Sequence, residues 1–478
     1  MTPAAPSPSS GGAGLSDDVR HWIETVTGSA LTAFEQVPAG GRTGYFVDVH
    51  SPEHGARALF LQRGGRGGTG SFMGFEHEAE VYGALEPLGI AVPHVWGFDE
   101  SLDVLLVDRA GGQPWFQAPR DPAEALAVAR DFMAHLAAWH RVPARDLPLP
   151  GFGPVRSVRE HQLEQLRGIE AAFAAQDARE PIDLLARAQL DLLRSRVPDY
   201  DGEPVLVQGD TGPGNFLYEN GRVTAIVDWE LAHLGDPMDD IAWLSWRATQ
   251  HGWPGFATRL REYEEASGIT VDPARVAYYR LNACARLGPS FGLADMGGAT
   301  AQGAAAAGGR SDAAVDRTAD GSGFIMTMLH RRMRLSAQAD AMGLELPDRH
   351  VGHEADVRAH AYLYDRVLDQ LKDIADRADD PVTSNLAKGS ARQVKYLKEI
   401  DRNSALFDGA ERDDLGRLLG RTPPSLDEGR ARLAAAAREG RVGLDEYLLY
   451  HWNRLVRDDW LMRPSSGAMY DRGWPALT

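Results

Sequence analysis

The stretch VLVQGDTGPGNFLYENGRVTAIVDWE, residues 205–230, decides the fold of this chain. An apolar strand leads to Asp210, and Asn215 follows five residues later, after a loop rich in glycine. The segments FLYE and RVTAIVD then flank the dipeptide AsnGly at 220–221, which is typical of a two-residue β-hairpin turn. The stretch therefore predicts a strand, a polar loop and a hairpin whose second strand leads to Asp228.

The register of this hairpin predicts which side chains meet. If the two residues that flank the turn pair with each other, Asn215 lies opposite Ile226, and Asp228 lies two residues further on. Residues two apart in a strand share a face, as do cross-strand partners. Asn215 and Asp228 should then point the same way at the open end, with Cα atoms about 7–8 Å apart.

An amide and a carboxylate at this distance can hold a hard cation such as Mg²⁺ between their oxygens. Asp210, on the loop leading into the same end, lies where a general base for a hydroxyl would be needed. Short polar residues in a loop rich in glycine and proline also cap turns, and turn capping alone would explain any single one of these three residues. Three such residues at these spacings favour a functional site.

The stretch resembles the aminoglycoside phosphotransferase family, a small-molecule branch of the protein-kinase-like fold. QGDTGPGN is similar to the family's catalytic loop, which usually reads His-Gly-Asp-x-x-x-x-Asn, and IVDWELAHLGDPMDDIAWL at 226–244 is similar to its metal-binding strand and the following segment. The likeness extends more weakly back to about residue 31. It implies Asp210 as the catalytic base, and Asn215 and Asp228 as Mg²⁺ ligands.

The resemblance also implies a nucleotide site further upstream. It places a loop over the phosphates between the first two strands, and a glutamate on the helix after the third strand, where the family pairs it with a lysine of that strand. It also places a hinge that binds adenine through backbone groups. The residues that match are Gly40, Gly41, Thr43, Gly44, Glu78, Val107, Asp108 and Arg109.

Two positions depart from the family pattern. Gln62, in the third strand, stands where the family has lysine or arginine. Arg63 is the candidate replacement, but successive strand residues face opposite ways, so Arg63 could serve only if the register shifts or the strand bulges. Gln208 replaces the usual histidine before the catalytic aspartate, a residue whose role in the family is structural.

The rest of the chain predicts the surrounding architecture. Strands are expected at 31–37, 43–50, 56–63 and 104–107, with a helix at 75–88. Beyond Asp121 and Pro122, a favourable helix start, the pattern is helical. The expected class is α/β: a bilobal protein-kinase-like fold with a small mixed-sheet N-lobe, a mostly helical C-lobe and an additional C-terminal all-helical region. The expected segments are a disordered tail at 1–19, the N-lobe at 20–107, the C-lobe with the catalytic loop at 108–345, and a helical domain at 346–478.

Composition excludes several classes of partner. The 478 residues include 50 Lys and Arg against 68 Asp and Glu, a net charge of −18, which argues against nucleic acid as a partner. No run of apolar residues is long enough to span a membrane, and the N-terminus does not resemble a secretory signal. The lone Cys284 suits a reducing compartment. A cytoplasmic enzyme without a membrane partner is therefore expected.

The predicted function is ATP- or GTP-dependent, Mg²⁺-assisted transfer of a γ-phosphoryl group to a hydroxyl of a small molecule. Family acceptors include antibiotics, choline, homoserine, sugars and hydroxyacyl thioesters, and the sequence does not choose among them. Gln62 motivates an alternative, a nucleotide-binding pseudokinase that acts as an interaction protein. A third reading, a dinucleotide-dependent oxidoreductase, rests on G-x-G-x-x-G at 65–70; it requires a second parallel strand near 90–98, which Pro93 disfavours.

Overall fold

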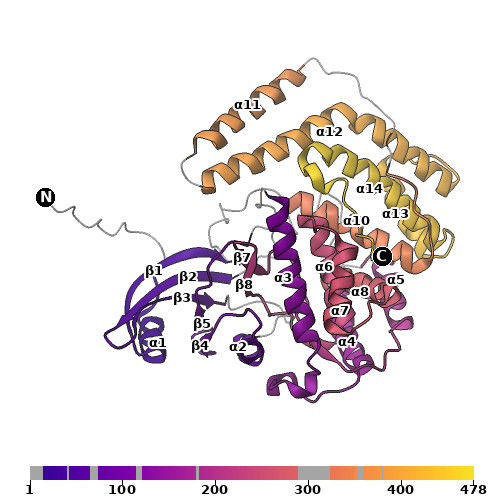
Figure 1. Cartoon of the computed structure of the whole chain (residues 1–478). Helices are drawn as coiled ribbons and strands as arrows, with labels where there is room; N and C mark the ends of the chain where they lie inside the picture. Colours follow the sequence, from indigo (N-terminus) through magenta and orange to yellow (C-terminus); the bar gives the residue numbers. More distant parts are fainter. Residues whose placement is uncertain are drawn as a thin grey trace. The chain divides into compact units, whose positions relative to one another are not determined.

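The computed structural model describes residues 14–39, 42–64, 74–114, 121–178, 182–288, 323–349, 351, 360–378 and 381–478. The chain forms two compact units (Figure 1). The first comprises Met1–Val155, Pro204–Leu234 and Arg261–Ile269, and the second comprises Arg156–Glu203, Gly235–Leu260 and Thr270–Thr478. The residues predicted to form the site fall in the first unit, so this unit is described first.

A five-stranded sheet forms one side of the first unit. Its strands are β1 (Ala30–Ala39), β2 (Arg42–Ser51), β3 (Gly55–Arg63), β4 (Val95–Asp99) and β5 (Val104–Asp108). Their order in the sheet is β1-β2-β3-β5-β4, and each neighbouring pair is antiparallel. The strands expected at 31–37, 43–50, 56–63 and 104–107 are confirmed. The helix expected at 75–88 is α2 (Phe75–Leu85), followed by a single 3₁₀ turn over Glu86–Leu88.

Two elements of this unit differ from the expectation. Helix α1 (Asp17–Thr27) begins inside the segment expected to be a disordered tail, because Leu15 and Val19 are buried in the core beneath the sheet. Residues 1–13 lie outside the described residues. Strand β4 begins two residues after Pro93, where the sequence disfavoured a strand. The proline precedes the strand instead of interrupting it, and β4 is an edge strand, where proline is tolerated.

The two faces of the sheet carry different residues. Leu59 and Leu61 of β3 are fully buried and pack in one cluster with Val19 and Ile23 of α1. Because side chains alternate along a strand, Gln62 points to the opposite face. That face carries the polar contacts from which the site is built.

The rest of the first unit carries the catalytic-loop segment. It contains α3 (Pro122–His140), β6 (Val205–Val207), the hairpin of β7 (Phe216–Glu219) and β8 (Arg222–Ile226), the start of β9 (His233–Gly235), which pairs with β6, and the second half of α7 (Phe256–Ser267). Asp121 caps α3 as expected, since its side chain accepts a hydrogen bond from the Ala123 amide. The strand, loop and hairpin predicted from residues 205–230 are confirmed.

The second unit is helical. Its helices are α4 (Val158–Asp177), α5 (Leu184–Ser195), α6 (Pro237–His251), α8 (Pro273–Arg286), α10 (Gly323–Met342), α11 (Ala361–Arg377), α12 (Pro381–Leu419), α13 (Leu426–Arg438) and α14 (Leu444–Ser466). Figure 1 shows α11 running alongside α12, and the two helices are in contact. None of the helices in the described part of the chain is long and apolar enough to span a membrane.

The C-terminal helices share a core with earlier helices of this unit. Leu185 of α5, Leu335 of α10, Leu433 of α13 and Leu448 of α14 are buried in one hydrophobic cluster. The expected boundary at residue 346 therefore runs through a shared core, and separate folding of the residues beyond it stays a prediction.

Candidate active site

The loop from Asp210 to Asn215, predicted as the catalytic loop, is held by the Asn215 side chain. This side chain is buried, and its Nδ2 donates hydrogen bonds to the backbone oxygen of Asp210 at 2.7 Å and to Asp210 Oδ2 at 2.8 Å. The two bonds fix the Asp210 carboxylate with one oxygen turned toward Asn215. They also orient the Asn215 amide so that its Oδ1, which can only accept, is left for another ligand.

The hairpin turn forms as predicted, but the register differs by one residue. Asn220 and Gly221 both have positive φ, 51° and 77°, as a two-residue hairpin turn of this type requires. Phe216, however, is paired with Ile226, so the predicted pairing of Asn215 with Ile226 is wrong. The Val227 amide instead donates to the Asn215 carbonyl at 2.9 Å.

A bulge at Thr224 causes this shift. Leu217 pairs with Ala225 while Tyr218 pairs with Val223, so Thr224 is an extra residue in β8. Its hydroxyl donates to the backbone oxygen of Gly111 at 2.6 Å, a contact with a distant segment that the hairpin sequence does not reveal.

Asp228 reaches the site through its backbone conformation, not through strand alternation. Its φ is +64°, a left-handed conformation that is uncommon outside glycine. The preceding residue is anchored, since Gln208 Nε2 donates to the Val227 oxygen at 2.8 Å. Gln208 thus ties the catalytic loop to the end of the hairpin, a structural role like the one expected of the family's histidine.

Asp228 lies in an acidic environment. Burial raises the pKa of its carboxyl to about 7, and the charges of Glu230, Glu78 and Asp210 contribute, while Arg42 acts in the opposite direction. Burial also raises the pKa of Glu230. The negative charges of Asp228 and these three carboxylates repel one another, so a cation bound among them would be stabilising.

The donors present fit Mg²⁺. No group of three or more His, Cys, Asp or Glu side chains in the described ranges is arranged to hold a metal alone. Mg²⁺ usually takes one or two protein carboxylates and completes its shell with water and substrate phosphates. Asp228 and the Asn215 Oδ1 would supply such a partial, all-oxygen set.

Arg42, which the sequence reading did not single out, lies at the centre of the polar contacts. Its Nη1 donates to Glu78 Oε2 at 2.7 Å and to Gln62 Oε1 at 2.9 Å, and its Nη2 pairs with Glu230 Oε2 at 2.7 Å. Its guanidinium lies over the Phe75 ring, 4.7 Å from the centroid. The strand register could have found it, because Gly44 pairs with Gln62 and Arg42 lies two residues earlier on the same face.

Glu78 and Arg63 are placed differently from each other. Glu78 lies on α2 as expected, is fully buried, and accepts a further hydrogen bond from the Tyr82 hydroxyl at 3.0 Å. Arg63 lies at the end of β3, whose pairing with β2 is regular up to this residue, so it faces away from Gln62. Within the described residues, no ion pair joins Arg63 to Glu78; Arg42 holds that carboxylate instead.

The expected phosphate loop is only partly described. Gly40 and Gly41 lie outside the described residues. Thr43 and Gly44 belong to β2, where they pair with Arg63 and Gln62, so these two residues are strand and not loop.

The expected adenine hinge lies at the end of β5. The Asp108 amide donates to the His94 oxygen at 2.9 Å, and the Arg109 amide donates to the Ala58 oxygen at 3.1 Å. These two amides are therefore already hydrogen-bonded to backbone oxygens of neighbouring segments. Adenine recognition by Val107, Asp108 and Arg109 stays a prediction. The Arg109 side chain pairs with Asp48 at 2.7 Å.

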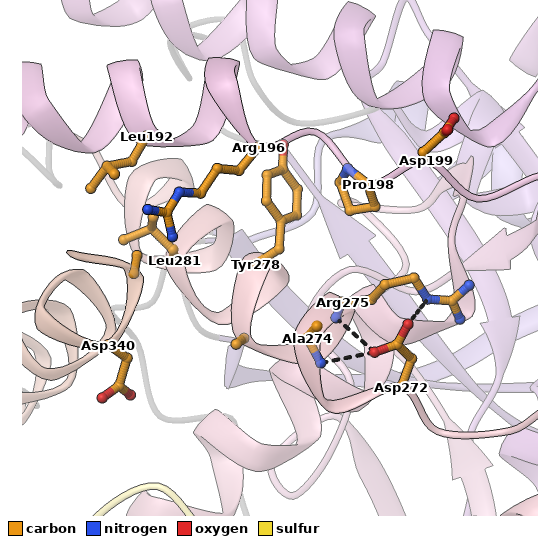
Figure 2. A pocket seen from close by; sticks show the side chains of 12 residues that line it. Leu192, Arg196, Pro198, Asp199, Asp272, Ala274, Arg275, Tyr278, Leu281 and Asp340 are labelled. Atoms are coloured by element: carbon orange, nitrogen blue, oxygen red, sulfur yellow. Dashed lines mark hydrogen bonds and ion pairs between the residues drawn. The ribbon is translucent and has the colours of Figure 1, made fainter. Parts of the chain in front are cut away.

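The second unit contains a cavity of its own. It has a volume of about 470 Å³, and its lining includes Arg196, Tyr278 and Asp340 (Figure 2). Asp272 caps α8 at its rim by accepting from the Ala274 and Arg275 amides. None of the site residues predicted from the sequence lines this cavity.

The family comparison decides the identity of the fold. The family described as "Phosphotransferase enzyme family" matches residues 37–279, just over half of the 478 residues. The chain belongs to this phosphotransferase family. The predicted family and the predicted fold class, a bilobal protein-kinase-like fold with an additional helical region, are confirmed.

Individual relatives of this phosphotransferase are distant. Human Acyl-CoA dehydrogenase family member 11 is 31% identical over 163 residues, which are 33% of this chain and 20% of the human protein. Hygromycin-B 4-O-kinase of Escherichia coli is 28% identical over 214 residues, 40% of this chain and 61% of the kinase. The chain thus spans about a fifth of the first relative and three fifths of the second.

A solved structure supports the fold. A candidate aminoglycoside phosphotransferase from Ralstonia eutropha superposes with a TM-score of 0.50 at 19% identity, covering 68% of this chain and 98% of that one. At this identity the likeness shows the fold alone.

Proposed function

We propose that this phosphotransferase transfers the γ-phosphoryl group of ATP or GTP to a hydroxyl of a small molecule. Asp210 is the general base, and Asn215 and Asp228 are the ligands of a Mg²⁺ ion. The observation that carries the proposal is the pair of hydrogen bonds from Asn215 to Asp210, which join the proposed base to a proposed metal ligand.

Asp210 acts on the acceptor. Its half-buried carboxylate, held by Asn215 through Oδ2, accepts the proton of the attacking hydroxyl. Loss of this proton accompanies formation of the bond between the acceptor oxygen and phosphorus. General-base assistance of this kind typically accelerates a reaction by about 10²–10⁴-fold.

Asn215 and Asp228 act on the nucleotide side. The Asn215 Oδ1 and the Asp228 carboxylate would hold Mg²⁺, which neutralises the charge of the phosphates during transfer. The crowding of Asp228 by Glu230, Glu78 and Asp210 supports this assignment, because a cation offsets that repulsion.

The acceptor is proposed as a class. The match to Hygromycin-B 4-O-kinase, whose name describes phosphorylation of an antibiotic hydroxyl, supports a small molecule as the acceptor. The match to Acyl-CoA dehydrogenase family member 11 covers only a fifth of that protein, so its name does not argue for dehydrogenase chemistry.

Gln62 favours one alternative, a pseudokinase that binds nucleotide without transferring phosphate. The oxidoreductase reading rests on the glycines at 65–70, which lie outside the described residues. A dinucleotide-binding fold also requires a parallel strand near 90–98. The strand found there, β4, is antiparallel to its neighbour and lies at the edge of the sheet.

A screen tests the proposal directly. Purified protein is incubated with ATP or GTP, Mg²⁺ and a panel of hydroxyl-bearing metabolites and antibiotics, and release of ADP or GDP is followed, with Asp210→Asn as the control. Acceptor-dependent release by the wild type and not by the variant supports the proposal. Nucleotide binding without release on any acceptor favours the pseudokinase, and tighter binding of NAD(P) than of ATP–Mg²⁺ favours the oxidoreductase.

A further inference from the structure

We propose that Arg42, from β2, supplies the phosphate-binding cation that the family takes from the third strand, and that Gln62 positions it. The inference rests on the proposed function, since it names a further residue of the same nucleotide site. It also explains the departure at Gln62 without invoking an inactive enzyme.

The contacts of Arg42 carry the inference. The glutamate expected to hold the cation, Glu78, is present, fully buried, and paired with Arg42 at 2.7 Å. The residue at the lysine position, Gln62, accepts a second bond from the same Arg42 Nη1 at 2.9 Å. A positive charge therefore reaches the expected glutamate, but it comes from the neighbouring strand.

The register explains why an arginine can do this from β2. Arg42 and Gly44 share a face of β2, and Gly44 pairs with Gln62, so Arg42 lies diagonal to Gln62 across the sheet. The neutral amide at residue 62 is an acceptor for the guanidinium. A lysine at residue 62 would instead place a second cation against it.

The remaining donors of Arg42 are available for phosphate. A guanidinium has five N–H donors. Within the described residues, the hydrogen bonds to Gln62 and Glu78 both come from Nη1, Nη2 forms an ion pair with Glu230, and the side chain is 18% exposed. The planar group is steadied by the Phe75 ring, and such a fork suits phosphate oxygens.

Other arginines of the sheet fit the role less well. Arg63 lies on the opposite face of β3 from Gln62. Arg109 is paired with Asp48 at 2.7 Å, and its guanidinium lies over the Phe46 ring. Arg42 is the one of these three that contacts Glu78.

An exchange of side chains separates a phosphate-binding role from a structural one. The variants are Arg42→Gln, Gln62→Arg, the double exchange Arg42→Gln/Gln62→Arg, and the matched control Arg63→Gln. Each is assayed by calorimetric titration with ATP–Mg²⁺ and by thermal melting. The double exchange keeps the composition and returns the cation to the third strand.

We expect Arg42→Gln to weaken ATP–Mg²⁺ binding by about ten- to a hundredfold, the usual cost of losing a hydrogen bond to a charged group. The double exchange should restore most of the affinity, and Arg63→Gln should bind as the wild type does. If Arg42 had only a structural role, Arg42→Gln would lower the melting temperature, but ATP–Mg²⁺ affinity would not show this pattern of loss and rescue.

Two outcomes overturn the inference while leaving the proposed function intact: wild-type affinity in a folded Arg42→Gln, or a folded double exchange that does not regain affinity. If Arg42→Gln does not fold, the double exchange decides alone, because tight binding supports the inference and weak or absent binding overturns it. A wild type that binds neither ATP–Mg²⁺ nor GTP–Mg²⁺ overturns the proposed function, and the inference with it.

Discussion

Asn215 donates one hydrogen bond to the Asp210 backbone and another to the Asp210 carboxylate, at 2.7 and 2.8 Å. The pair links the two ends of the loop from Asp210 to Asn215 and so holds the proposed base beside a proposed metal ligand. A second bond, from Gln208 Nε2 to the Val227 oxygen, ties the strand before this loop to the end of the hairpin.

Asp228→Asn should change metal binding and stability in opposite directions. Removing this charge should weaken ATP binding in Mg²⁺ at least about tenfold, because a ligand oxygen loses its charge. It should also raise the melting temperature without Mg²⁺, because one of four crowded carboxylates is removed. Calorimetry and melting curves with Mg²⁺ or with EDTA measure both effects, and Glu219→Gln, exposed on the same hairpin, is the control. Lower stability in EDTA together with unchanged Mg²⁺-dependent binding would contradict the metal assignment.

Gln208→Ala should loosen the catalytic loop, because it removes the bond to the Val227 oxygen. We expect a loss of about 1–2 kcal/mol in the free energy of unfolding and a lower turnover. Gln208→His should recover much of both, because histidine occupies this position in the family. Urea unfolding and steady-state rates measure the two effects. If Gln208→Ala is as stable and as active as the wild type, the bond has no role in holding the loop.

Asp236 should make the second unit less stable as the pH rises. Its carboxyl caps α6 and is buried, and burial raises its pKa from 3.8 to about 6, while Arg275 opposes the shift. The folded state therefore holds the proton more tightly than the unfolded state. The contribution present below pH 4 is lost as the pH rises through about 6.

Asp236→Asn keeps the cap and removes this titration. Relative to the wild type, the variant should gain about 2–3 kcal/mol of unfolding free energy between pH 4 and pH 7. Urea unfolding at both pH values measures the difference, and Asp199→Asn, at an exposed position of the same unit, serves as the control. A constant difference between Asp236→Asn and the wild type would show that Asp236 does not titrate in this range.

The C-terminal helices should need α10 in order to fold well. Met328 and Leu335 of α10 share a core with Leu448 of α14, and Arg332 pairs with buried Asp459 at 2.7 Å. A fragment of residues 323–478 should therefore melt more cooperatively, and at a higher temperature, than residues 346–478. Circular dichroism of the two fragments measures this. Equal melting curves would support the boundary at residue 346 that the sequence predicts.

Local features of the site could be predicted from the sequence, and long-range ones could not. The AsnGly turn, the loop from Asp210 to Asn215 and the strand before it follow from residues close together in the chain. The hairpin register was missed by one residue because Thr224 bonds to Gly111, more than a hundred residues earlier. Because of this shift in register, Asp228 is oriented by its left-handed backbone conformation, which residue spacing does not predict.

The role of Arg42 shows the same limit. The sequence identifies Gln62 as a departure and offers its neighbour Arg63 as the replacement. The actual partner of Glu78 comes from another strand, 36 residues away, and is also fixed by Glu230 at the far end of the catalytic segment. Helix α1 was missed in part because its burial depends on the sheet that it covers.

The most direct test of the account is the effect of Asp210→Asn on binding and on turnover, once an acceptor has been found. The substitution keeps the shape and the bond partner but removes the basic oxygen. The account predicts that turnover falls by about two to four orders of magnitude, while the dissociation constant for ATP–Mg²⁺, measured by calorimetry, stays within about twofold. Asp201→Asn, at an exposed position upstream, should change neither quantity. Full turnover by Asp210→Asn on a true substrate would contradict the assignment of the catalytic base.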